Sequence, residues 1–167
     1  MADLFVSYAR RNRDRVAHIS GGLERAGYSL WWDRRLTSGL DYGMVIEREI
    51  EAARCVVVAW SEAARQSLWV RAEANEALDA GKLVQLSLDG ARLPLPFTML
   101  HCLDFSRWGG GAGEPWPELE GKLRAAVAGE AAEPSSRIEA LPAGPALQGF
   151  GSAARLGWAA LAAGAVF

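Results

Sequence analysis

Short apolar runs alternate with amphipathic stretches along residues 1–128. The runs are too short for helices and are rich in β-branched and aromatic residues, which predicts strands at 4–6, 28–32, 55–60, 83–88 and 103–105. The third run is continuously apolar, so we expect this strand to be buried on both faces of a parallel sheet. Alternating strands and helices are typical of α/β proteins. The pattern therefore predicts a flavodoxin-like fold, with about five parallel strands flanked by helices.

The stretches between the apolar runs carry hydrophobic residues at helical spacing. The first predicted helix begins at Asn12 or Asp14, either of which can act as its N-cap. Asp41 is placed to cap the second helix. The third helix is expected to run without a break over about 62–80, because its apolar stripe continues through that range. Pro117 can open the last helix.

The composition changes after the predicted domain 1–128. Residues 129–150 contain several prolines and little periodicity, so we expect a linker. Residues 151–167 are almost all apolar, and Arg155 is their one charged residue. They predict either the first part of a transmembrane helix in a longer protein or an Ala-rich helix that docks on a partner. Arg137 and Arg155 precede the uncharged run, as expected where a cytoplasmic domain leads into a membrane anchor. We favour a domain at the cytoplasmic face, anchored through 151–167.

Charge and cysteine usage narrow the function classes. The 18 basic and 20 acidic side chains give a net charge of −2, which argues against a nucleic-acid partner. Cys55 and Cys102 lie in apolar runs and show neither a disulfide framework nor metal-ligand spacing. We therefore expect no metal site. The chain leads from Met1 directly into a strand without a signal peptide, which favours the cytosol.

Polar and aromatic residues follow the predicted strands at the edge where a parallel sheet binds its ligands. Ser7 and Tyr8 end the first strand, and Trp32 and Asp33 end the second. Aromatic rings beside a carboxylate suit a flat heteroaromatic ligand with ribose hydroxyls. Two neighbouring tryptophans can also simply alternate across the sheet. We accept this packing role for Trp31 and leave it open for Trp32.

Trp69 and Glu73 are spaced four residues apart on the third predicted helix, so they share one of its faces. A glutamate that is partly desolvated beside a large ring is a candidate functional carboxylate. The alternative is a surface glutamate that pairs with Arg65.

Four segments, taken in order and at suitable spacing, resemble a Toll/interleukin-1 receptor (TIR) domain of the bacterial type. From the first to the last they lie within residues 3–108, which is nearly all of the predicted domain. They are Leu4-Phe5-Val6-Ser7-Tyr8-Ala9, Leu30-Trp31-Trp32-Asp33 with the following loop and Gly39, Ser67-Leu68-Trp69-Val70-Arg71-Ala72-Glu73, and Leu103-Asp104-Phe105-Ser106.

The resemblance implies an activity, because many TIR domains cleave NAD with a glutamate four residues after a tryptophan. Glu73 matches that catalytic position, and NAD would be its substrate, with no cofactor. The nucleotide pocket implied by the resemblance consists of Tyr8, Arg10, Trp32, Asp33, Ser38 and Trp69. Ser38 stands where some relatives have an acidic group.

The resemblance also implies partners. Such domains become active on self-association, when the loop near residues 34–41 meets a neighbouring subunit. The alternative is a non-catalytic adaptor that only pairs with other TIR domains. A phosphoacceptor receiver domain shares the sheet but needs an aspartate at the end of the third strand, where this chain has Trp60 and Ser61.

Overall fold

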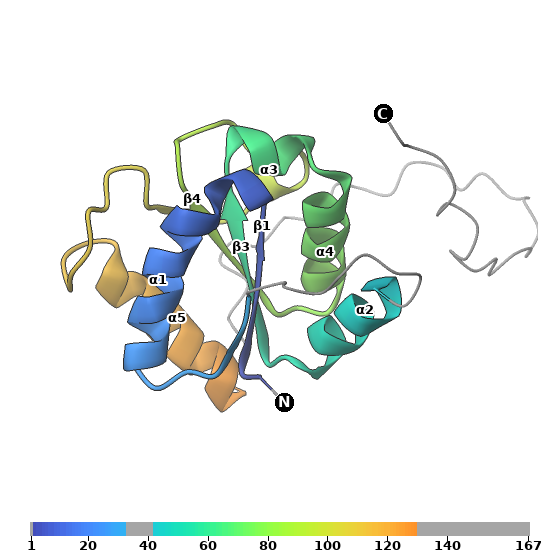
Figure 1. The fold of residues 1–167 in the computed structure, drawn as a ribbon, viewed down its shortest axis with the longest axis horizontal. Helices are drawn as coiled ribbons and strands as arrows, with labels where there is room; N and C mark the ends of the chain where they lie inside the picture. Colours follow the sequence, from blue (N-terminus) through green and yellow to red (C-terminus); the bar gives the residue numbers. More distant parts are fainter. Residues whose placement is uncertain (1, 33–41, 130–167) are drawn as a thin grey trace, which may run out of the picture. The chain divides into compact units, whose positions relative to one another are not determined.

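The computed structural model describes residues 2–32 and 42–129, in which strands and helices alternate (Figure 1). The strands are β1 (Leu4–Tyr8), β2 (Leu30–Trp31), β3 (Cys55–Trp60), β4 (Leu83–Ser87) and β5 (Leu103–Asp104). The α-helices are α1 (Arg13–Arg25), α2 (Tyr42–Ala52), α3 (Glu62–Gln66), α4 (Leu68–Asp79) and α5 (Trp116–Ala128). Two short 3₁₀ helices are η1 (Arg10–Asn12) and η2 (Phe97–Met99).

The five strands form one parallel sheet in the order β2-β1-β3-β4-β5. This arrangement confirms the predicted flavodoxin-like fold. The chain first moves from β1 to β2 and then crosses back to β3 on the other side of β1. The direction of winding therefore reverses between β1 and β3, and open α/β sheets bind ligands at the carboxyl ends of such a pair.

The strands β1 to β4 send alternate side chains to two opposite faces of the sheet, where two separate cores lie. Along β1, Leu4, Val6 and Tyr8 pack with α1 and α5, in what we call the α1/α5 layer. Phe5 points the other way and packs with α2, α3 and α4, in the α2/α4 layer. Figure 1 shows α1 and α5 together on one side of the sheet and α2 and α4 on the other. All six residues of β3 are buried, as predicted for a central parallel strand.

The predicted helix over 62–80 is wrong in one respect, because Ser67 divides it into α3 and α4. The backbone of Ser67 is extended, with φ −77° and ψ 120°. Its amide donates back to the carbonyl of Ala64, and its hydroxyl accepts from the amide of Val70. One residue thus ends the first helix and caps the second, a role that serine favours.

The start of α1 also differs from the expectation. Asn12 occupies the N-cap position, but its side chain makes no capping bond to the helix. Instead, Asn12 Oδ1 accepts a hydrogen bond of 2.7 Å from the Ser61 hydroxyl. Asn12 therefore ties the start of α1 to the end of β3. Asp41, the expected cap of α2, lies outside the described residues.

The helix α5 ends at Ala128, followed by Gly129 in the left-handed region with φ +75°. Apart from Gly129, the predicted linker 129–150 and the apolar segment 151–167 lie outside the described residues. Within residues 2–32 and 42–129, no helix combines the length and apolar character needed to cross a bilayer.

Candidate functional site

Glu73 lies in the middle of α4 and is buried in the α2/α4 layer, with 3% of its surface exposed. The hydroxyl of Ser7 on β1 donates a hydrogen bond of 2.5 Å to Glu73 Oε2. Ser7 is itself fully buried, and it lies next to the carboxyl end of β1, opposite Val58 of β3. The carboxylate is therefore held at the place where the winding of the sheet reverses, which is the ligand-binding edge of this fold.

The alternative prediction, a surface glutamate paired with Arg65, is wrong. Arg65 forms its ion pair with Glu62 at 3.0 Å, one turn away on α3. Glu73 instead belongs to the buried side of α4, together with Val70, Ala74 and Ala77. A carboxylate among such apolar neighbours is costly to bury, so its presence requires a specific partner or a function.

The sequence analysis did not assign Ser7 a role beside Glu73. The available signal was a hydroxyl inside an otherwise apolar strand, in phase with Phe5 and therefore on the same face of the sheet. This alternation predicts on which face of the sheet the Ser7 hydroxyl lies, but it does not predict which helix residue the hydroxyl contacts. The pairing of Ser7 with Glu73 required the packing of α4 on β1.

Trp69 lies one turn before Glu73 and is much more exposed, with 56% of its surface accessible to solvent. The preceding Leu68 is 78% exposed. The two residues of the predicted pair therefore lie at different depths. The glutamate is buried in the α2/α4 layer, and the indole ring is at the surface near the start of α4.

Tyr8 and Trp32 come together, but in the α1/α5 layer. Their ring centroids are 6.4 Å apart at an interplanar angle of 48°. Trp32 also donates from Nε1 to the Glu24 carboxylate at 3.4 Å. Trp31 points to the other face and stacks on Phe5 at 4.9 Å. The two tryptophans thus alternate across the sheet, and the Tyr8–Trp32 pair lies on the opposite face from Glu73.

The remaining predicted site residues follow the ends of β1 and β2. Arg10 is exposed in η1, two residues after the end of β1. Asp33 and Ser38 lie outside the described residues.

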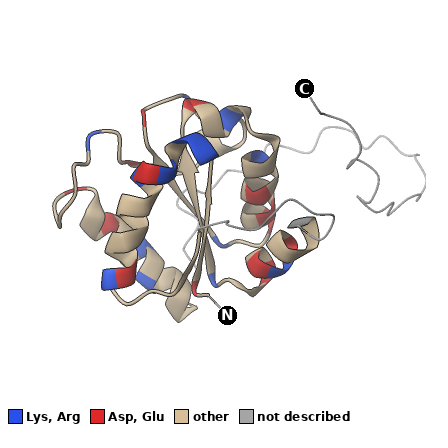
Figure 2. Cartoon of the chain, viewed as in Figure 1, with Lys and Arg blue, Asp and Glu red and all other residues tan. Residues whose placement is uncertain are grey.

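The cysteines offer no thiolate at neutral pH. Burial raises the pKa of Cys55 to about 12, and it raises the pKa of Cys102 to about 12 as well. Both thiols stay protonated, which disfavours metal ligation and nucleophilic attack. In the described part of the chain, His, Cys, Asp and Glu form no group of three that could hold a metal ion. Basic and acidic residues are interspersed over the helices around this core (Figure 2).

Comparison with known proteins identifies the fold. The family model of the TIR domain matches residues 4–119. The TIR domain of the Toll-related receptor TRR-2 from Hydra magnipapillata superposes with a TM-score of 0.64 at 21% identity, over 74% of this chain and 99% of that chain. A TIR-STING receptor from C. gigas, in complex with 2′,3′-cGAMP, gives a TM-score of 0.57 at 21% identity, over 76% of this chain and 40% of that chain.

A search of curated protein sequences found no significant match. The structural likenesses, at these identities, concern the fold, and the family model covers most of the sheet and its helices. The chain belongs to the TIR domain family.

Proposed function

We propose that this TIR domain hydrolyses NAD, releasing nicotinamide, and that Glu73 is its catalytic residue. One observation carries the proposal: a buried carboxylate is held by Ser7 at the reversal point of the sheet. The glutamate also follows Trp69 by four residues, which is the pattern that TIR domains with this activity show.

The chemistry needs only one carboxylate. The bond that breaks joins C1′ of the ribose to the ring nitrogen of nicotinamide. Its electron pair leaves with the ring, which is cationic in NAD and departs neutral, so no acid has to protonate it. Most glycosidases, in contrast, use a second carboxyl group as an acid for the leaving oxygen.

The carboxylate of Glu73 stabilises the positive charge that develops on the ribosyl carbon. This attraction is stronger in a buried site than in water, because the effective dielectric constant is lower. A water molecule then adds its oxygen to C1′ and loses a proton, which gives ADP-ribose. In a cyclising reaction, an atom of the adenosine part takes the place of this water.

The exposed residues around the sheet edge supply contacts for the rest of the substrate. The Arg10 guanidinium can hold the pyrophosphate, and the ring of Trp69 can stack on a base. The resemblance to TIR domains adds Asp33 and Ser38 to the proposed pocket, and both lie outside the described residues. Tyr8 and Trp32 pack in the α1/α5 layer, so we assign them to the support of this edge.

A second function is favoured by the exposed apolar side chains at the start of α4. Leu68 and Trp69 are neighbours, and both are more than half exposed. Apolar residues gathered at a surface are typical of protein interfaces. They suit a contact between TIR domains, either as the step that activates the enzyme or as the only task of an adaptor.

The test compares NAD turnover by the wild type with that of two matched variants on the same helix. Glu73→Gln keeps the size of the side chain and an acceptor for the Ser7 hydroxyl, but it removes the charge. We expect it to lower nicotinamide release by at least about 100-fold. Glu76→Gln changes an exposed glutamate of α4 and should leave release unchanged. An equal loss of nicotinamide release in both variants would show that Glu73 is not the catalytic residue. Release by Glu73→Gln at the wild-type rate would show the same.

A further inference from the structure

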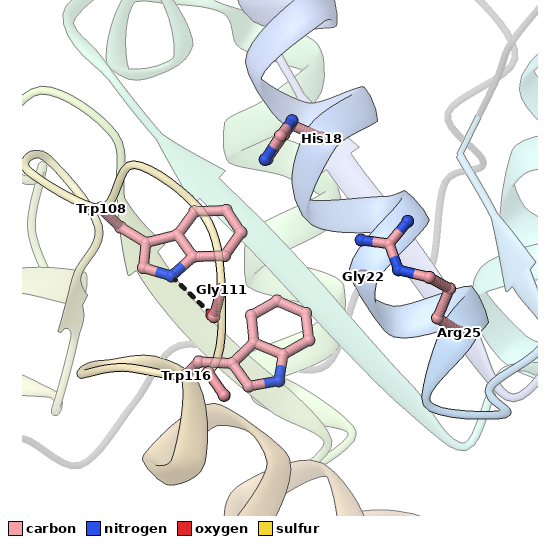
Figure 3. A pocket seen from close by; sticks show the side chains of 7 residues that line it. His18, Gly22, Arg25, Trp108, Gly111 and Trp116 are labelled. Atoms are coloured by element: carbon pink, nitrogen blue, oxygen red, sulfur yellow. Dashed lines mark hydrogen bonds between the residues drawn. The ribbon is translucent and has the colours of Figure 1, made fainter.

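A pocket of about 180 Å³ lies in the α1/α5 layer (Figure 3). Glu73 packs on the other face of the sheet. Its walls come from α1 and from the segment 108–116, which leads into α5. The lining side chains used below are His18, Gly22, Arg25, Trp108 and Trp116. The proposed NAD site uses none of these residues.

Two indole rings form one wall of the pocket. Trp108 and Trp116 are stacked, with ring centroids 5.3 Å apart and an interplanar angle of 12°. The Trp108 Nε1 donates to the Gly111 carbonyl at 3.2 Å, and the Trp116 Nε1 donates to Glu120 Oε1 at 2.8 Å. Because both N–H groups are bound within the protein, the rings are oriented before any ligand arrives.

At Gly22, the helix α1 is in direct contact with the Trp116 ring. A methyl group at this position would lie 2.4 Å from the Trp116 ring, so only glycine lets the ring approach the helix. The imidazole of His18 adds an aromatic edge, at 5.5 Å from the Trp108 ring centroid and an angle of 68°. These contacts hold both indole rings against α1, and a planar group entering the pocket meets the accessible part of the half-buried Trp108 ring.

The charge of the lining is positive. Arg25 brings a guanidinium, and the seven lining residues include no carboxylate. In the described part of the chain, the ion pairs found within 4.0 Å involve other cations and leave Arg25 without a carboxylate partner. An exposed guanidinium beside aromatic rings favours a flat anion, which it can bind with two parallel hydrogen bonds.

We propose that this pocket binds a small aromatic carboxylate. The volume is well below the roughly 300–1,000 Å³ of pockets for drug-sized ligands, so it admits one ring with its carboxylate and excludes a dinucleotide. The ring lies against the accessible part of Trp108, and the carboxylate pairs with Arg25. This proposal is independent of the NAD reaction, because its residues belong to the other face of the sheet.

The test titrates the full chain with benzoate and follows the indole N–H signals of Trp108 and Trp116 by heteronuclear NMR. Benzyl alcohol provides a neutral ligand with the same ring. For a ligand of about nine heavy atoms we expect a saturable shift with a dissociation constant of about 1 mM. Benzoate should bind Arg25→Gln about tenfold more weakly, and the wild type should bind benzyl alcohol more weakly by a similar factor.

Arg71→Gln serves as the matched control, because Arg71 is exposed on α4 and lies outside the pocket lining. It should bind benzoate like the wild type. Three results would each overturn the proposal: no saturable shift of the two indole signals, equal affinity for benzoate and benzyl alcohol, or unchanged benzoate affinity in Arg25→Gln. Thermal unfolding of each variant verifies that it is folded.

Discussion

At the scale of single residues, the hydrogen bond from Ser7 to Glu73 connects the sheet to the proposed catalytic group. We predict that Ser7→Ala lowers kcat for NAD by about 10- to 100-fold with little change in KM, because the carboxylate loses the contact that orients it. Ser7→Thr keeps the hydroxyl and should recover most of the rate. Steady-state kinetics of the two variants provide the measurement. A higher KM at normal kcat in Ser7→Ala would instead make Ser7 a substrate contact.

Two adjacent glycines of α1 give opposite predictions for stability. Gly22→Ala places a methyl group 2.4 Å from the Trp116 ring, so we expect it to lower the free energy of unfolding by about 1–3 kcal/mol. In Gly21→Ala, the new methyl group meets the end of the Arg25 side chain at 3.5 Å. That variant should be more stable by about 0.5–1 kcal/mol, because alanine favours a helix. Urea unfolding measures the free energy of unfolding of both variants. Equal changes in the two variants would contradict the packing of Trp116 on α1.

At the scale of elements, two serines define the start of each half of the helical segment after β3. Ser61 is buried, accepts from the Ala64 amide at 3.0 Å and donates to Asn12, whereas Ser67 accepts only a longer bond of 3.4 Å from Val70. We expect Ser61→Ala to cost about 1–3 kcal/mol of unfolding free energy and Ser67→Ala about 0.5–1 kcal/mol. Chemical denaturation measures the loss of unfolding free energy in each variant, and the loss should be larger for Ser61→Ala. A larger cost for Ser67→Ala would contradict it.

The sequence predicted the elements better than their junctions. The strands and their parallel arrangement followed from short apolar runs separated by amphipathic stretches, and Cys55–Trp60 matches β3 residue for residue. The break at Ser67 was missed because the apolar stripe stays in phase across it. The spacing to Trp69 made Glu73 a candidate functional carboxylate, but it did not predict how deeply Glu73 is buried, because spacing along one helix does not say what packs against it. Likewise, Tyr8 and Trp32 were placed at the correct edge, while only the packing of β1 and β2 showed which face they occupy.

At the scale of the whole molecule, we expect stability to fall at high pH through the two cysteine thiols, Cys55 and Cys102, of which Cys55 is the more deeply buried. Burial raises the pKa of the Cys55 thiol from about 9 to about 12. Between these values the unfolded chain loses the proton and the folded chain keeps it, so the free energy of unfolding falls as pH rises, by about 1.4 kcal/mol per pH unit from this group. Below pH 9 the effect vanishes, because the thiol is protonated in both states. Cys55→Ala should show a shallower decrease above pH 9 in urea unfolding, and parallel curves would contradict this assignment.

We propose that this TIR domain cleaves NAD when its copies are brought together, with the buried Glu73 as the catalytic carboxylate. The most direct measurement is nicotinamide release from NAD by the full chain clustered on beads, with assembly of the free protein followed by light scattering. We expect release by the clustered wild type, with one ADP-ribose or cyclic product per nicotinamide, and none above background in Glu73→Gln. Assembly without any nicotinamide release from the wild type would contradict the claim and make the domain an adaptor.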